Sequence, residues 1–270
     1  MTSFAPRFHN DPPRFVTSPL LEEHGLPHLF TTRHFPGVLR PTESRPPFGP
    51  AARPLLTAHG LAGDPAYARQ VHGATVLRAE RDGFAGHADA LTTARPGLPL
   101  CISTADCLPV VLYDARAGRL AAVHAGWRGT VQSVTHAAAA AMIDAGSAAA
   151  DLTVAIGPSI GPCCYEVDAP VIARLKAAFP GGWETWATPK GPGKWMLDLW
   201  GANRDQLIAT GVRPERIDLM RLCTGCRPDL LFSYRRERGA GRLVAVAALP
   251  GSKTPRGAPP AGPDGPRPAC

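Results

Sequence analysis

Lysine and charged residues in general are scarce in this chain of 270 residues. Only 19% of the residues are charged, while 44% are hydrophobic, and this balance excludes a mostly disordered protein. The net charge is +7, but the basic residues are nearly all arginines and form no long basic run. This distribution argues against a nucleic-acid-binding module. Four of the 29 basic residues are lysines: Lys176, Lys190, Lys194 and Lys253.

Long hydrophobic runs are also missing. No apolar stretch approaches the ~18–20 residues that span a bilayer, and the N-terminus lacks a basic segment followed by an apolar one. The sequence therefore predicts no membrane association and a cytoplasmic location, where cysteines serve as thiols, metal ligands or nucleophiles more readily than as disulfides. There are seven cysteines, an odd number: Cys101, Cys107, Cys163, Cys164, Cys223, Cys226 and Cys270.

A GxGxxG fingerprint and a regular alternation of strands and helices are absent too. The pattern instead predicts an α+β (irregular α/β) fold, a single domain with mixed sheets flanked by helices. Apolar runs bounded by turn residues predict strands at 28–33, 98–103, 109–114, 119–124, 152–156, 217–222, 229–234 and 242–249. Helices are predicted at 129–145, 169–178 and 198–210.

Proline marks both ends of this domain. Ten prolines occur by Pro50, and we expect residues 1–27 to form a Pro-rich N-terminal segment ahead of a domain at 28–250. Residues 251–270 contain six prolines and four glycines and almost no side chain that a core would bury. Such a composition predicts a disordered tail.

Three residues have the side chains of a zinc site. Cys107 begins one predicted strand, His124 ends the next, and His72 lies in a turn-rich segment. Neighbouring strands can bring such positions together, and zinc accepts this mixture of imidazole and thiolate ligands. Three protein ligands leave a fourth position for water or substrate. Ordinary packing is the alternative for each residue taken alone.

A second group of cysteines lies in loops. Cys163 and Cys164 follow two Gly-Pro turns, and Cys223 and Cys226 form a CxxC pair. The four could make an all-thiolate zinc site, but the adjacent pair fits usual ligand spacing poorly. No thioredoxin-like unit surrounds the CxxC pair, which argues against a redox motif. A shaped structural loop is an equally good interpretation of residues 157–167.

Several long motifs together resemble one known family, the laccase-domain (multicopper polyphenol oxidase-like) family, which includes purine nucleoside phosphorylases and the bacterial peptidoglycan editing factor. The matching stretches occur in family order over residues 28–250: Phe30–Arg33, Arg69–Gly73, Ala105–Val110, Val123–Thr130, Ile156–Val167 and Phe232–Arg236. The resemblance implies a fold similar to a bacterial toxin deamidase. One family element, a Ser-Leu-Asn turn, is missing from the Pro-rich segment before His59, so substrate choice is left open.

The resemblance also implies a site and a reaction. His72, Cys107 and His124 correspond to the family's zinc ligands. The implied activity is zinc-dependent phosphorolysis of adenosine, inosine, guanosine and methylthioadenosine, with deamination of adenosine as a second reaction. The partners would be purine nucleosides and phosphate. Guanidinium binds phosphate bidentately, so we expect Arg33 or Arg128 to hold the anion.

One further candidate residue and two alternative functions follow from the sequence. Asp106 is a candidate base or ligand-orienting group, or else a turn residue. In the first alternative, the protein is a cysteine-type amide hydrolase that edits peptidoglycan precursors, with Cys107 as nucleophile and His124 as base. In the second, it is a copper phenol oxidase, but nine scattered histidines without an HxH pair argue against multicopper chemistry. The sequence gives no signal for the oligomeric state.

Overall fold

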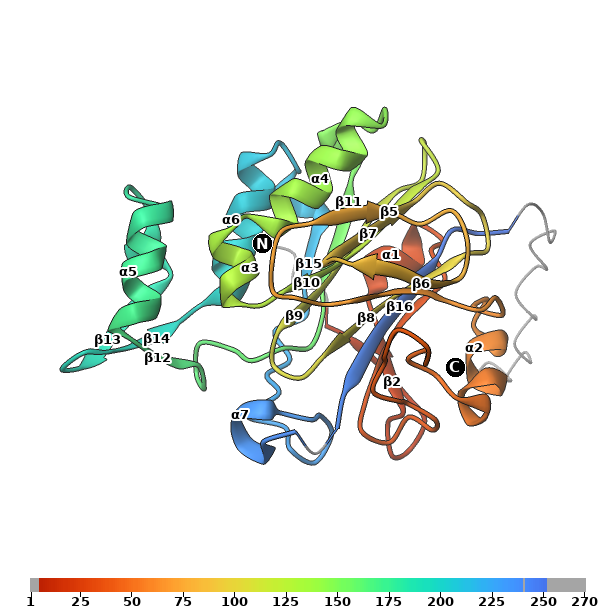
Figure 1. Cartoon of the computed structure of the whole chain (residues 1–270), viewed down its shortest axis with the longest axis horizontal. Coiled ribbons are helices and arrows are strands. Elements are labelled where there is room, and N and C mark those ends of the chain that lie inside the picture. Colours follow the sequence, from red (N-terminus) through yellow and green to blue (C-terminus); the bar gives the residue numbers. More distant parts are fainter. Residues whose placement is uncertain (1–4, 240, 252–270) are drawn as a thin grey trace, which may run out of the picture.

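Two large β-sheets form the centre of the molecule in the computed structural model, which describes residues 5–239 and 241–251 (Figure 1). Both sheets mix parallel and antiparallel pairs. The seven-stranded sheet has the order β1 (Arg7–His9), β2 (Phe15–Thr17), β3 (His28–Thr31), β16 (Leu243–Ala248), β8 (Pro99–Thr104), β4 (Ala66–Arg69), β6 (Gly83–His87). The six-stranded sheet has the order β15 (Ile217–Leu219), β11 (Thr153–Ile156), β9 (Leu108–Asp114), β10 (Arg119–Ala125), β7 (Ala90–Thr93), β5 (Val76–Arg78).

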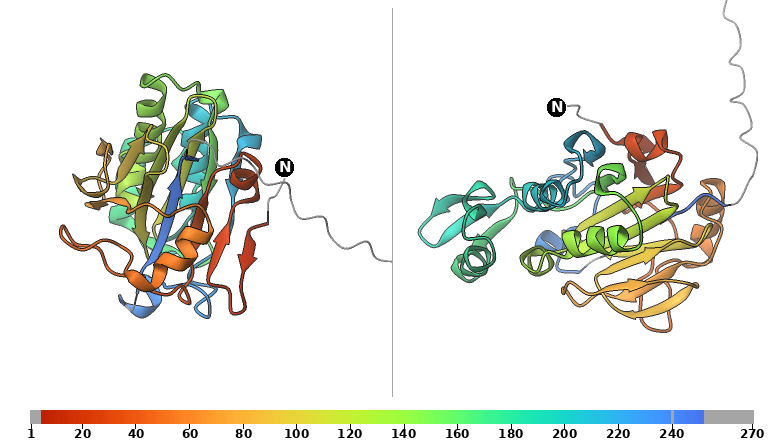
Figure 2. Two further views of the ribbon diagram at one scale, coloured as in Figure 1. Left: turned by 90° about the vertical axis from the view of Figure 1, so that its right-hand side faces the viewer. Right: turned by 90° about the horizontal axis from the view of Figure 1, so that it is seen from above.

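A small third sheet extends from one end of this body. It consists of β12 (Glu166–Asp168), β14 (Lys194–Leu197) and β13 (Ala187–Gly191), and it carries α5 (Ala169–Ala178). Figures 1 and 2 show this unit projecting beyond the two large sheets. The other α-helices are α1 (Pro19–Glu23), α2 (Arg53–Ala58), α3 (Trp127–Val131), α4 (Val134–Asp144), α6 (Leu199–Ala209) and α7 (Tyr234–Glu237).

The six-stranded sheet is buried on both faces: α4 and α6 cover one face, and the seven-stranded sheet covers the other. Alternate side chains of each strand therefore enter two different cores. Leu112 of β9 packs with Ala138 and Met142 of α4, and α6 completes that layer. The next residue, Val111, packs between the two sheets against Ile102 of β8. Strands covered on both faces are almost continuously apolar, which is the pattern that the sequence shows here.

The fold class expected from the sequence is confirmed, with two corrections to its elements. The single helix expected at 129–145 is divided into α3 and α4, because Ser133 has a φ of 58° that an α-helix cannot continue through. The strand expected at 229–234 is wrong: its residues form turns that lead into α7. Leu230 and Leu231 are buried nonetheless, so burial in a loop produced the apolar run.

The Pro-rich N-terminal segment contributes to the same core as residues 28–250. β2 pairs with β3, and Phe15 and Val16 are buried. Short strands and an N-terminal helix turn tolerate the prolines around them, so their number does not separate this segment from the sheet. The tail predicted at 251–270 lies, apart from Gly251, outside the described residues.

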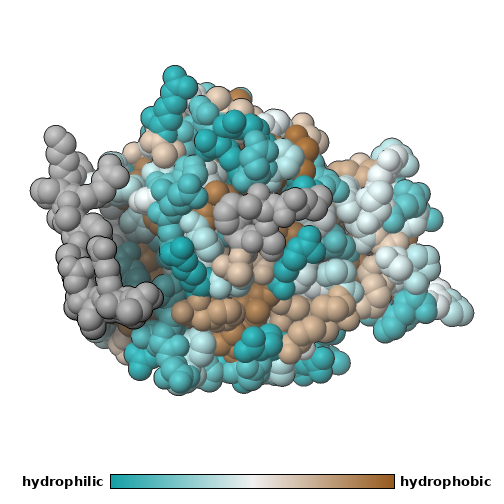
Figure 3. Space-filling model, turned by 180° about the vertical axis from the view of Figure 1, so that it is seen from behind, coloured by the Kyte–Doolittle hydropathy of each residue, from teal (hydrophilic) through white to brown (hydrophobic). Residues whose placement is uncertain are grey.

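Within the described residues, no helix is long and apolar enough to cross a membrane. The face opposite to that of Figure 1 is largely hydrophilic, with a band of apolar residues across its lower middle (Figure 3).

Candidate functional site

The structure brings His72, Cys107 and His124 together at one end of the β9–β10 hairpin. His124 pairs with Pro109 across the hairpin, so Cys107, just before β9, lies at the same end. His72 reaches this end from the loop after β4, with a φ of 60°. One potential ligand atom from each residue lies within 4.8 Å of the other two. The order of the two strands thus brings Cys107 and His124 together, and the loop after β4 adds His72.

Asp89 organises this cluster, and sequence reasoning missed it. Its buried carboxylate accepts a 2.8 Å hydrogen bond from Nδ1 of His124. It also accepts backbone N–H bonds from the loop that carries His72: 3.2 Å from Val71, 2.9 Å from His72 and 2.6 Å from Gly73. An acidic residue inside the apolar stretch 88–91 was the available signal, because a buried charge needs partners.

Gly126 keeps the centre of the cluster open. A Cβ atom at this position would lie 2.8 Å from Sγ of Cys107 and 3.3 Å from Cδ2 of His72. Any larger residue would displace one of the two side chains. The rings of His72 and His124 meet edge to face, with 4.8 Å between their centroids.

The cluster is also electrostatically coupled. Burial alone would raise the pKa of Cys107, but His124 and His72 hydrogen-bond and attract its thiolate and lower that pKa to about 6. Burial alone would lower the pKa of His124, but Cys107 and Asp89 raise it to about 9. A thiolate is the form of cysteine that binds metals and acts as a nucleophile, so the site favours the reactive form at neutral pH.

Asp106 is adjacent to Cys107 but faces away from the cluster. Its two carboxylate oxygens each accept a 2.6 Å hydrogen bond, one from the hydroxyl of Thr224 and one from the backbone N–H of Arg235. Its φ of 88° turns the chain sharply just before Cys107. These contacts favour a role in shaping the turn over a role as a base.

The two expected anion-binding arginines have different surroundings. Arg33 is in an ion pair with Glu237, donates to the carbonyl oxygen of Leu231 and stacks on Phe232. Its charge is therefore already compensated within the protein. Arg128 is exposed beside Trp127, over whose ring its guanidinium lies at 4.7 Å, and it follows the cluster closely in the chain. The geometry favours Arg128 over Arg33 for a free anion.

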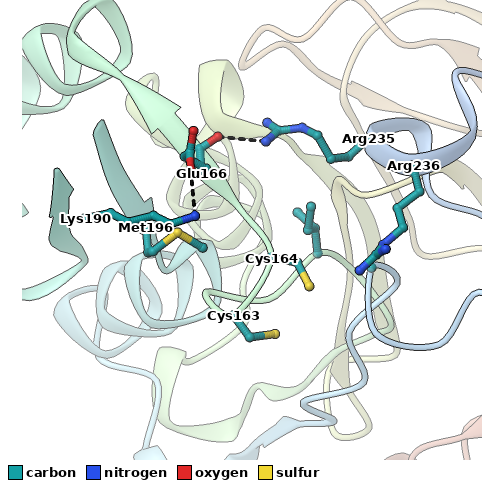
Figure 4. Close-up of a pocket in the computed structure, with 9 residues that line it drawn as sticks. Cys163, Cys164, Glu166, Lys190, Met196, Arg235 and Arg236 are labelled. Carbon is teal, nitrogen blue, oxygen red and sulfur yellow. Dashed lines mark hydrogen bonds and ion pairs between the residues drawn. The ribbon is translucent and has the colours of Figure 1, made fainter. Parts of the chain in front are cut away.

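A cavity of about 520 Å³ lies on the side of the small sheet, within the ~300–1,000 Å³ common for ligand pockets. Figure 4 shows the side chains that line it. Arg235 and Lys190 both bind Glu166 there, whereas the guanidinium of Arg236 has no hydrogen-bond or ion-pair partner within the described chain.

Tyr165 connects this cavity with the His72–Cys107–His124 cluster. The residues on either side of it, Cys164 and Glu166, line the cavity. Burial and the nearby Cys107 raise the pKa of the Tyr165 hydroxyl, while Arg235 and Arg128 oppose that increase. The guanidinium of Arg235, a lining residue, lies 5.2 Å from the centre of the Tyr165 ring. Ile160, which also lines the cavity, donates its N–H to the carbonyl oxygen of Asp106, next to Cys107, so the two regions are neighbours.

The fold, the motifs and the cluster together define a family. The family model described as multi-copper polyphenol oxidoreductase laccase matches residues 51–250, and the chain belongs to this family. The resemblance inferred from the sequence is thereby confirmed.

Curated relatives and solved structures agree with this assignment. A purine nucleoside phosphorylase of Deinococcus radiodurans is 39% identical over 247 residues, covering 86% of this chain and 93% of the relative. The crystal structure of YlmD from Geobacillus stearothermophilus matches with a TM-score of 0.78 and 29% identity, over 90% of this chain and 98% of that one. YfiH from Bacillus licheniformis matches over the same shares, with a TM-score of 0.76 and 29% identity.

Proposed function

We propose that this protein is a zinc-dependent purine nucleoside phosphorylase, with phosphate and purine nucleosides such as adenosine, inosine, guanosine and methylthioadenosine as substrates. The observation that carries the proposal is the His72–Cys107–His124 cluster with its orienting carboxylate, Asp89. Relatives named purine nucleoside phosphorylase support the choice of reaction.

The donor set fits zinc. Two imidazoles and one thiolate suit this metal, and ligands at ~2.0–2.3 Å from it lie about 3.3–3.8 Å apart, within the spread of the cluster. Asp89 holds Nδ1 of His124, as carboxylates do for many metal-binding histidines, and leaves Nε2 for the metal. Bound there, zinc would supply Lewis-acid polarisation of an oxygen at its open position.

The chain's own residues would bind and orient the substrates. Arg128 beside the cluster and Arg236 on the cavity wall have no ion-pair partner within the described residues and could hold phosphate, and the cavity next to Tyr165 has room for a nucleoside. A phosphate oxygen would attack C1′ of the ribose while the bond from C1′ to the purine nitrogen breaks. The electron pair leaves with the purine, which takes up a proton, and the products are purine and ribose 1-phosphate.

The test is an assay of the purified protein with its zinc content measured. Adenosine is supplied with and without phosphate, followed by the other three nucleosides. We expect adenine and ribose 1-phosphate only when phosphate is present. Inosine formed from adenosine and water would establish the proposed second reaction, deamination. A zinc-free Cys107→Ala protein with full phosphorolysis would refute the proposal.

A second candidate, the cysteine-type amide hydrolase, is favoured by one specific observation. Cys107 contacts His124, and His124 contacts Asp89. A nucleophile, a base and an orienting acid in this order form the arrangement of a catalytic triad. His72 separates the two functions because a triad does not need a second imidazole. His72→Ala should abolish zinc-dependent phosphorolysis but leave amide hydrolysis of a muropeptide substrate intact.

Copper-dependent phenol oxidation has little support in the structure despite the family description. All nine histidines lie in the described residues, and only His72 and His124 belong to a group of three or more potential ligands there. A laccase needs several such groups. We therefore expect that the copper-loaded protein does not oxidise a phenol.

A further inference from the structure

We propose a second metal site, a structural zinc bound by the four thiolates of Cys163, Cys164, Cys223 and Cys226. One thiol from each residue lies within 4.8 Å of the other three. This site is separate from the His72–Cys107–His124 cluster and does not depend on the proposed function. The sequence spacing argued against such a site, because two of its ligands are adjacent residues.

The distances between the sulfur atoms match a metal site better than a disulfide. Sγ of Cys226 lies 3.4 Å from Sγ of Cys163 and 3.5 Å from Sγ of Cys164. A zinc ion with Zn–S bonds of about 2.3 Å separates its thiolates by about 3.8 Å in a tetrahedron. A disulfide bond would require about 2.05 Å. These two pairs of sulfur atoms would have to move apart by only about 0.3–0.4 Å to reach the tetrahedral spacing around zinc.

The backbone already brings the two cysteine loops together. Ser159 and Cys223 form a parallel bridge, with a 3.1 Å hydrogen bond from the Ser159 N–H to the Leu222 carbonyl and another from the Thr224 N–H to the Ser159 carbonyl. The N–H of Gly161 donates to Sγ of Cys223 at 3.2 Å. Such a donor stabilises negative charge on sulfur, as a thiolate ligand requires.

Gly225, inside the CxxC pair, makes the close approach possible. A Cβ atom there would lie 2.8 Å from Cβ and 3.0 Å from Sγ of Cys164. Only glycine therefore lets the CxxC turn contact the adjacent pair of cysteines.

Charge and exposure are also consistent with a zinc ion. Binding replaces four thiol protons by Zn²⁺ and leaves a net charge of −2 on the site. Arg235 and Arg236 line the cavity that contains Cys163 and Cys164 and provide nearby positive charge, whereas Lys190 in the same cavity is paired with Glu166 (Figure 4). With four protein ligands the coordination is complete, which is typical of structural rather than catalytic zinc.

The experiment measures zinc per chain in the full-length protein, purified under reducing conditions and loaded with zinc. We expect two zinc ions in the wild type, one in Cys226→Ser and one in Cys107→Ser. Cys101→Ser, a buried cysteine outside both groups, is the matched control and should keep two. In the Cys107→Ser background, cobalt should give the intense charge-transfer absorption of four thiolates, and chelation should lower Tm by several degrees.

The possible results are distinct. Two zinc ions retained by Cys226→Ser, or bound iron with visible absorption, would overturn the proposal, as would a mass 2 Da below that of the reduced chain. If Cys226→Ser does not fold, Cys163→Ser at an exposed position replaces it with the same expectation. A wild type that binds one zinc, lost in Cys226→Ser and kept in Cys107→Ser, would support this site and refute the zinc dependence of the proposed function.

Discussion

The two groups of potential ligands in this protein are built in opposite ways. His72, Cys107 and His124 lie at the end of a buried hairpin and beside it, and Asp89 fixes two of them. The four cysteines lie on two loops joined by a short backbone bridge. The first group offers three potential ligands of two kinds and would leave a metal one open position, whereas the second offers four identical thiols. A metal site with an open position is typical of catalysis, whereas a site with four protein ligands is typical of structural support.

One added methyl group at each site tests most directly whether the two groups have different roles. Gly126→Ala places a Cβ within 2.8 Å of the Cys107 sulfur, and Gly225→Ala places one within 2.8 Å of Cys164. A displacement near 1 Å at a catalytic centre costs about 100-fold in rate. We expect that loss of phosphorolysis from Gly126→Ala. Gly225→Ala should lose the second zinc and, because Gly225 lines the cavity, should raise the KM for the nucleoside while kcat changes little. Paired kinetics and metal analysis measure both effects.

The reverse pattern, with Gly225→Ala inactive and Gly126→Ala normal, would show that the roles of the two groups are exchanged. Both variants should be checked for folding by circular dichroism before the comparison is made.

The titration of Cys107 gives a second test on metal-free protein. Its pKa of about 6 lies below the ordinary 9.0, so the thiolate is present above about pH 6 and disappears as the pH falls through that value. At pH 7 its thiolate fraction should exceed that of an ordinary thiol roughly 90-fold. Alkylation of Cys107, followed by peptide mass spectrometry, should have its midpoint near pH 6.

Cys101 is the internal control for this titration because burial raises its pKa well above the ordinary value. A midpoint for Cys107 above pH 8 would contradict the coupling to His124 and His72.

Substitution of Asp89 tests whether the His72–Cys107–His124 cluster depends on its orienting carboxylate. Asp89→Asn retains the shape but replaces one acceptor oxygen by an NH₂ group, which then opposes an N–H donor from His124 or the 71–73 loop. Loss of such a partner usually weakens metal binding 10- to 100-fold. Competition with a chelator should show this decrease for the first zinc. Asp106→Asn is the matched control, and equal weakening by both would argue against a specific role for Asp89.

The smallest effect concerns the anion. Arg128→Gln should raise the KM for phosphate by about tenfold, the cost of one charge-assisted contact, with a smaller change in kcat. Arg33→Gln should leave that KM nearly unchanged, because Glu237 already occupies Arg33. If steady-state kinetics instead showed a larger increase in the KM for phosphate with Arg33→Gln than with Arg128→Gln, Arg33 would be the anion-binding residue.

Local patterns were sufficient for the family, the fold class and most of the central strands. Residues 169–178 form α5 as predicted, with proline in the first helical turn, and the β9–β10 hairpin follows from two apolar runs separated by a turn. Cys107 and His124 could be paired in advance because the two ends of a hairpin necessarily meet. His72 was included because its imidazole completes a zinc ligand set, and the resemblance supported that choice; it lies too far away in sequence for periodicity to place it.

Tertiary structure alone decided the rest. Asp89, the engagement of Arg33 by Glu237 and the packing of β2 into the sheet all depend on contacts between distant segments, which no local pattern records. The four cysteines show the same limit. The adjacency of Cys163 and Cys164 argued against a metal ion shared by all four, but two loops some 60 residues apart meet through a backbone bridge and a close contact at Gly225. Short-range chemistry thus determined which side chains were available, and long-range packing determined which of them face one another.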